Sequence, residues 1–191
     1  MENQLTWDEY RVLARRTQDP SLSPQEKLAH AVLGLCSELH EAELEAAALV
    51  FGFPEFSSDV KQRLALEIGD CYWMIAEICD YFDGENSSIK FFPPPEPRNS
   101  RSSLPYVGNA AVEGARAHLC NLAQKAFQGH APKKDPCVQR ALLNIGRHLG
   151  QLAERSGFKT QTILHMNIEK LKERYPDGFS AERSVNREED V

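Results

Sequence analysis

The feature that most restricts the fold of this chain is an internal repeat. Residues 62–77 (QRLALEIGDCYWMIAE) align without a gap with residues 139–154 (QRALLNIGRHLGQLAE). The segments before them also align, more weakly, as residues 34–44 (GLCSELHEAEL) and 114–124 (GARAHLCNLAQ). A repeated unit that cannot bury its apolar face alone must pack against its copy. The repeat therefore predicts one bundle made of a duplicated helical hairpin, with the copies related by an approximate two-fold axis.

Helix start and stop signals give the limits of the first copy. Ser23-Pro24 followed by Glu26 combines a capping serine, a proline at the first helical position and a glutamate three residues after the cap. A helix is expected from there to Phe51-Gly52, and a second one from about residue 58 to residue 84. The two are expected to form an antiparallel hairpin.

The second half of the chain contains the same kinds of helix start and stop signals. Helices are expected over residues 110–128 and 136–156, each closed by a glycine, and a last helix over residues 160–174, capped by Thr160. No segment alternates with period two for long enough to predict a strand. The predicted fold class is all-α, a helical bundle built from a duplicated antiparallel hairpin plus a C-terminal helix.

The two copies differ in their acidic residues. Glu38, Glu41, Glu67 and Asp70 of the first copy align with His118, Asn121, Asn144 and Arg147 of the second, so all four carboxylates are lost while the apolar pattern is retained. Acids on a merely solvated face would not be expected to disappear at these positions alone. We therefore interpret the first hairpin as the one that binds metal and the second as a scaffold.

Helix geometry predicts that the four carboxylates meet. Glu38 and Glu41 are three residues apart, as are Glu67 and Asp70, so each pair lies on one helix face. At 1.5 Å per residue, Glu41 lies about 15 Å before the first helix ends and Glu67 about 13 Å after the second begins. Acids held this close need compensating cations or protons. Hard oxygen ligands favour Mg²⁺ or Mn²⁺. The alternative is that all four are solvent-facing charges.

Composition and missing motifs argue against several classes of binding partner and enzyme. The formal net charge of −6 disfavours nucleic acid, because that affinity depends on Lys and Arg neutralising phosphates. No apolar run approaches the length of a membrane span and the N-terminus lacks signal-peptide features, so we expect no membrane partner and a cytoplasmic location. No GxxxxGK[ST] loop is present, which disfavours a P-loop ATPase, and no Glu-x-x-His element supports a di-iron bundle.

These residues resemble a known family. The elements Glu38-Leu39-His40-Glu41 and Glu67-Ile68-Gly69-Asp70 resemble the ExxE and ExxD motifs of the MazG-like all-α nucleoside triphosphate pyrophosphohydrolases, which are related to dimeric dUTPase- and dCTPase-type enzymes. The stretch NIEKLKERYPDGFS resembles the family's N-x-x-K-L-x-x-R-Y-P signature. His40 stands where many relatives have glycine, and the basic C-terminal helix follows the second copy rather than the first.

The resemblance implies metal-dependent cleavage of a nucleoside triphosphate between the α and β phosphates, giving the monophosphate and pyrophosphate. It implies that Glu38, Glu41, Glu67 and Asp70 bind the metal and that Glu38 or Glu41 orients or deprotonates the attacking water. It also implies phosphate contacts. The candidates for them are Asn167, Lys170 and Arg174, together with Arg147, for which a surface arginine is an equally good interpretation.

We expect one domain of this MazG-like type over residues 1–191, and the resemblance covers most of residues 24–180. Its parts are a metal-binding hairpin (24–83), an exposed Pro- and Ser-rich linker (84–108), a second hairpin (109–157) and a basic C-terminal helix and tail (160–180).

A homo-oligomer, a dimer or tetramer, is expected. The favoured substrate is a deoxyribonucleotide such as dGTP, although no residue identifies the base. The competing hypothesis is a non-catalytic helical module that binds a nucleotide or a protein.

Overall fold

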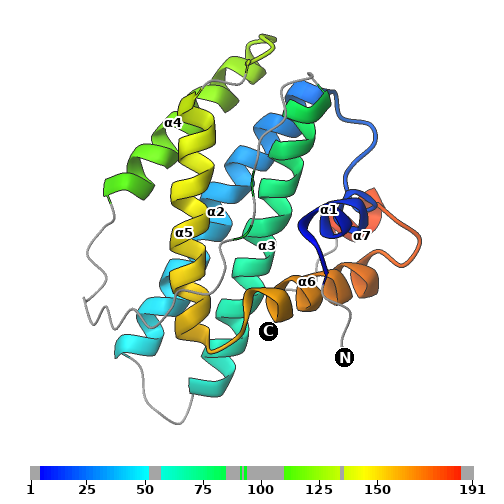
Figure 1. The fold of residues 1–191 in the computed structure, drawn as a ribbon. Helices are drawn as coiled ribbons and strands as arrows, with labels where there is room; N and C mark the ends of the chain where they lie inside the picture. Colours follow the sequence, from blue (N-terminus) through cyan, green and yellow to red (C-terminus); the bar gives the residue numbers. More distant parts are fainter. Residues whose placement is uncertain are drawn as a thin grey trace.

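Four long helices, two from each half of the repeat, form an antiparallel bundle (Figure 1). Helices α2 (Pro24–Phe51) and α3 (Ser57–Gly84) form the first hairpin, and α4 (Ala110–Phe127) and α5 (Pro136–Ser156) form the second. Helix α2 packs against α4, and α3 packs against α5. Corresponding helices of the two copies are thus in contact.

The computed structural model describes residues 5–51, 57–84, 91, 93, 110–133 and 136–185. Within these ranges the secondary structure consists of seven α-helices, and no strand is present. The all-α prediction is confirmed. In the same part of the chain, no helix has both the length and the apolar character needed to cross a membrane.

Local signals explain where the bundle helices begin and end. The Ser23 hydroxyl accepts from the Glu26 backbone N–H at 3.3 Å, and the Glu26 carboxylate accepts from the Ser23 N–H at 2.8 Å, which is the expected capping box. Gly129 and Gly157 follow α4 and α5 with φ of 78° and 80°, a left-handed conformation that costs glycine no steric clash.

The bundle core uses equivalent residues from both copies. Leu39 and Leu119 are aligned in the repeat, as are Ile68 and Ile145, and all four side chains are fully buried. Burial of each such side chain contributes about 1.5–3 kcal/mol to folding. The shared apolar pattern is therefore what holds the two hairpins together.

One buried ionic network also joins the hairpins. The Glu43 carboxylate on α2 accepts from Arg116 Nη2 on α4 at 2.5 Å and lies 3.0 Å from His148 Nε2 on α5. Glu43 and His148 are both buried. A buried carboxylate needs such partners because isolated burial of a charge is strongly unfavourable.

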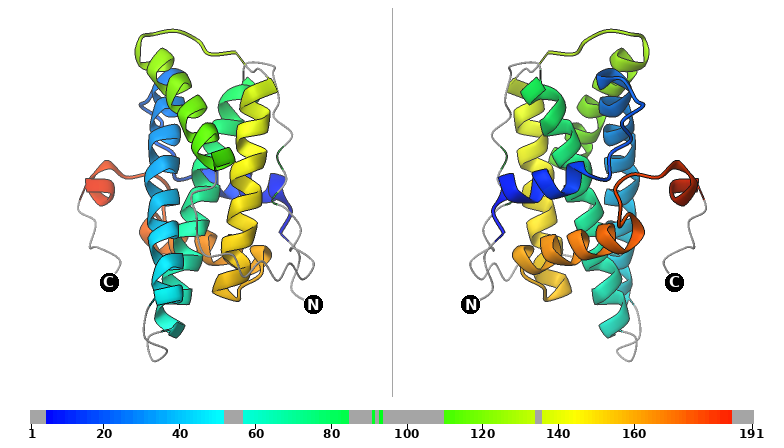
Figure 2. Two further views of the ribbon diagram at one scale, coloured as in Figure 1. Left: turned by 90° about the vertical axis from the view of Figure 1, so that its left-hand side faces the viewer. Right: turned by 90° about the vertical axis from the view of Figure 1, so that its right-hand side faces the viewer.

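Three shorter helices lie on one side of the bundle. Helix α6 (Thr160–Arg174) crosses α3, while α1 (Trp7–Arg15) and the short α7 (Ala181–Val185) lie beside it (Figures 1 and 2). The sequence analysis did not predict α1 or α7. A Thr6–Glu9 capping box begins α1 and is a signal that could have revealed it. The cap assigned to Thr160 was wrong, since Thr160 is the first helical residue and Lys159 occupies the cap position.

The segment 84–108 was predicted to be an exposed linker. Most of it lies outside the described residues, but Phe91 is 2% exposed and its ring centroid lies 5.1 Å from that of Trp7 and 6.4 Å from that of Tyr72. The prediction of an exposed connection is therefore wrong at Phe91, which contributes to the core.

Candidate metal centre

A cavity of about 730 Å³ lies between the first hairpin and the helices that cross it. Side chains from α2 and α3 line one wall, and residues of the α1–α2 connection, of α6, of the segment that follows α6 and of α7 contribute to the rest. This volume falls in the range of small-molecule binding sites. The cavity belongs to the first copy of the repeat.

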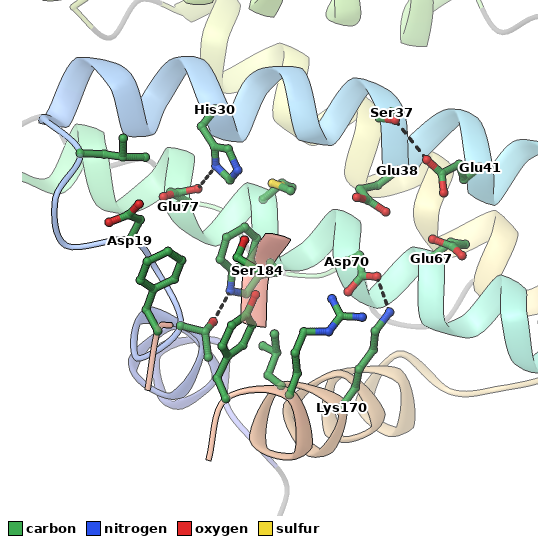
Figure 3. A pocket seen from close by; sticks show the side chains of 18 residues that line it. Asp19, His30, Ser37, Glu38, Glu41, Glu67, Asp70, Glu77, Lys170 and Ser184 are labelled. Atoms are coloured by element: carbon green, nitrogen blue, oxygen red, sulfur yellow. Dashed lines mark hydrogen bonds and ion pairs between the residues drawn. The ribbon is translucent and has the colours of Figure 1, made fainter. Parts of the chain in front are cut away.

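Three of the four predicted carboxylates meet at one end of this cavity. Glu38 on α2 and Glu67 and Asp70 on α3 each place a carboxylate oxygen within 4.8 Å of the others. The antiparallel pairing of α2 and α3 brings these positions to the same height, and the three-residue spacing turns both α3 acids to one face. The side chains converge from the two helices in Figure 3.

Glu41 lies at the edge of this cluster rather than inside it. Its side chain is exposed, lines the same cavity, and accepts a hydrogen bond from the Ser37 hydroxyl at 3.1 Å. The prediction was that all four carboxylates meet; all four line the cavity, but the tight group of oxygens contains only Glu38, Glu67 and Asp70. Glu41 is thus available to a ligand at the open side.

Burial and mutual repulsion make the ionised cluster unfavourable. Burial raises the pKa of Glu38 to about 8, with further contributions from the charges of Asp70, Glu41 and Glu67. The pKa of Glu67 is raised to about 7, mainly by burial and then by Asp70, while Lys170 acts in the opposite direction. Such shifts mean that the cluster holds protons at neutral pH unless another cation replaces them.

Helix α6 holds Asp70 by both of its oxygens. Asn167 Nδ2 donates to Oδ1 at 2.9 Å and Lys170 Nζ donates to Oδ2 at 2.8 Å. Asn167 is in turn fixed from α1, because the Tyr10 hydroxyl donates to its Oδ1 at 2.7 Å. Partners of this kind orient a ligating carboxylate.

Gly69 permits this close approach of α6 to α3. A Cβ at position 69 would lie 2.9 Å from the Asn167 Cβ, closer than real Cβ atoms approach. The role of Tyr10 in holding Asn167 was not predicted from the sequence. The role depends on α1, which was not predicted.

The predicted phosphate-binding residues separate into two groups. Lys170 and Arg174 line the cavity. Asn167 was predicted to contact phosphate, but it is 1% exposed and supports Asp70, so that prediction was wrong. Arg147 is exposed, donates to Asn144 at 3.2 Å and is not among the cavity residues, so the structure does not bring it to the site.

The other end of the cavity has a different lining, which the sequence analysis missed. Glu77 on α3 is 2% exposed, and its Oε2 lies 3.1 Å from His30 Nδ1 on α2. Trp73 lies between Glu77 and Asp70 along α3, and its indole N–H donates to Thr17 Oγ1 at 2.9 Å. The seven-residue spacing from Asp70 to Glu77, which keeps both on one helix face, was the available signal.

The described residues of the second hairpin contain no counterpart of the carboxylate cluster. Among the residues that the structure describes, Glu38, Glu67 and Asp70 are the one group of three or more acidic, histidine or cysteine side chains close enough to share an ion. Comparison of the chain with protein-family models, with curated proteins and with solved structures gives no match.

The residues of the cluster fit a hard divalent cation. They offer carboxylate oxygens from two helices, burial and the neighbouring acids raise the pKa values of Glu38 and Glu67, and Asp70 is already oriented by groups outside the cluster. Mg²⁺ and Mn²⁺ prefer such ligands, and Mg²⁺ commonly takes one or two protein carboxylates together with phosphate oxygens and water.

Proposed function

We propose that this protein hydrolyses a nucleoside triphosphate between the α and β phosphates, releasing the monophosphate and pyrophosphate, with Mg²⁺ or Mn²⁺ as cofactor. The observation that carries the proposal is the convergence of Glu38, Glu67 and Asp70 at one end of a cavity that Lys170 and Arg174 also line. The resemblance of the ExxE, ExxD and C-terminal motifs to MazG-like enzymes supports the same reaction.

The carboxylates and the cations of the site would act on different parts of the substrate. When bound, the metal would polarise the phosphoryl oxygens and make a water more acidic. Glu38 or Glu41 would orient that water or accept its proton; Glu41 is the more accessible of the two. Lys170 and Arg174 would neutralise charge on the triphosphate, as ammonium and guanidinium groups do in phosphoryl transfer.

The proposed setting is control of the nucleotide pool in the cytoplasm by a homo-oligomer, a dimer or tetramer. Among the described residues, six large apolar side chains are exposed to solvent on the single chain. They are Val12, Leu33, Leu44, Val50, Phe51 and Phe127.

The test is to incubate the full chain with each common NTP and dNTP and to separate the products by chromatography at early times. Monophosphate and pyrophosphate should form in equal amounts with Mg²⁺ or Mn²⁺ and should not form with a chelator. Diphosphate as the first product would move the attack to the γ phosphate and contradict the proposal. Nucleotide binding without any turnover would favour the non-catalytic module instead.

A further inference from the structure

The two ends of the cavity offer different chemistry. The carboxylates Glu38, Glu67 and Asp70 and the ammonium of Lys170 gather at one end, whereas His30 and Glu77 lie toward the other (Figure 3). Asp70 and Glu77 are seven residues apart on α3, a separation of about 10.5 Å along the helix. A ligand bound to the metal end by its phosphates would extend its far end toward Glu77.

Glu77 is unusual because it is an acid almost completely removed from solvent, yet its side chain borders the cavity. The His30 contact at Oε2 orients the carboxylate. A carboxylate accepts up to about four hydrogen bonds, so this contact does not exhaust its capacity. A ligand group that meets Glu77 must therefore donate hydrogen bonds, because an acceptor there would be repelled.

Trp73 supplies an apolar surface between the two ends. Its ring lines the cavity, is fixed by the hydrogen bond to Thr17 and meets the His30 ring edge-on with centroids 6.0 Å apart. Met74 borders the same space and packs against Gly34 of α2. A flat aromatic ligand group would gain stacking energy here.

We propose that Glu77 is the base-recognition residue and that the base is guanine; this inference rests on the proposed nucleotide hydrolysis. Guanine presents two adjacent donors, the ring N1–H and the 2-amino group, which match the two oxygens of one carboxylate. Adenine places an acceptor beside its amino group, cytosine does the same, and thymine and uracil flank one donor with two carbonyls. Guanine is the one common base that satisfies the carboxylate without repulsion.

The repeat supplies a matched control. Glu77 aligns with Glu154 on α5, which has the same side chain in the same register but is exposed to solvent away from the cavity. Glu77→Gln and Glu154→Gln thus make the same chemical change in equivalent helices. Only the first should alter base preference.

The experiment compares dGTP, dITP, which lacks the 2-amino group, and dATP. For the wild-type chain, kcat/KM should fall about tenfold or more from dGTP to dITP, because a site built to hydrogen-bond a group rejects the analogue without it. Glu77→Gln should lower kcat/KM for dGTP by about 10- to 100-fold, with little change for dATP. Glu154→Gln should match the wild type. Affinity for the α,β-imido analogue of dGTP, measured by calorimetry, should likewise be lowered in Glu77→Gln and unchanged in Glu154→Gln.

The outcomes separate the two proposals. Absence of pyrophosphate release from every nucleotide would contradict the proposed hydrolysis itself. Hydrolysis with a preference for adenine, cytosine, thymine or uracil, or a guanine preference that Glu77→Gln leaves unchanged, would overturn the role of Glu77 and leave the reaction intact. The wild-type series of dGTP and dITP does not depend on whether the variant folds.

Discussion

The first hairpin, α2 and α3, and the second, α4 and α5, share their packing but not their chemistry. Leu39 and Ile68 are as deeply buried as their equivalents Leu119 and Ile145. In contrast, the first hairpin brings three carboxylates together, and its aligned partner positions carry histidine, asparagine or arginine. The comparison teaches that the apolar pattern needed for folding and the polar pattern proposed for function can be separated between copies.

The C-terminal helix serves the first hairpin although it follows the second in sequence. Helix α6 begins directly after α5, crosses α3 and places Asn167 and Lys170 on the two oxygens of Asp70. The second half of the chain therefore contributes cations and positioning groups to a cluster whose acids all come from the first half. One chain contains the whole arrangement.

The test with the largest expected effect replaces aligned charged residues of the two hairpins by neutral side chains of the same or similar size. Asp70→Asn removes a charge from the carboxylate cluster at constant volume. If the proposed hydrolysis is correct, turnover should fall on the order of 1,000-fold, the scale observed when a transition-state-stabilising group is lost. Arg147→Gln, at the aligned position, should keep near wild-type turnover. Steady-state pyrophosphate release measures both. Equal losses, or none in Asp70→Asn, would remove the distinction between the hairpins.

A second test concerns Glu43, the carboxylate of the first hairpin that contacts Arg116 and His148 of the second. Glu43→Ala leaves Arg116 and the buried His148 without this carboxylate, and loss of one partner from a buried network costs about 3–5 kcal/mol of unfolding free energy. Denaturant titration followed by circular dichroism would measure it. Alanine already occupies the aligned position 123, so Ala123 shows that the fold does not need an acid in both copies. A change below 1 kcal/mol would mean that the network is not stabilising.

A third test measures how the stability of the folded chain depends on pH through the carboxylate cluster. The pKa values of Glu38 and Glu67 are raised to about 8 and about 7 from an ordinary 4.5, so between these limits the folded chain holds protons that the unfolded chain has released. In chelator, their stabilising contribution is complete below about pH 4.5 and is lost as pH rises through about 8.

The measurement is the melting temperature between pH 5 and pH 9. Millimolar Mg²⁺ or Mn²⁺ should raise it most at the alkaline end, where ionised ligands favour the ion. Glu38→Gln should flatten the pH dependence in chelator, whereas His118→Gln, at the aligned position, should not. A metal effect that is absent at every pH would count against the site.

The smallest expected effect compares two aligned glycines. A Cβ at position 34 would lie 2.3 Å from the Met74 Cε, whereas at position 114 nothing lies within 4 Å. Gly114→Ala should stabilise the chain by about 0.5–1 kcal/mol because glycine weakens a helix interior. Gly34→Ala should lose this gain and displace Met74 at the cavity. Identical melting temperatures for the two variants would show that the copies are packed alike at this position.

The helices of the bundle and the meeting of the carboxylates were predictable from sequence because both depend on short-range rules. Capping residues, terminal glycines and the 3.6-residue period gave the limits of α2 to α5 to within a few residues, and the matched heights of the two acidic pairs predicted a shared site. Helix α1 was missed although its capping box was visible, because nine residues are too few to establish the apolar period of a helix.

The sequence by itself determined the helical repeat, the loss of acids from its second copy and the candidate metal ligands. Helical periodicity and register depend on residues only a few positions apart, so they can be read without the tertiary structure. Only the tertiary structure decided which partners those residues meet. Asn167 supports Asp70 instead of facing the cavity, Arg147 faces solvent, and Glu77 is buried at the far end. These outcomes depend on how α6 and α1 cross α3, and crossing geometry follows from packing between distant segments rather than from any local pattern.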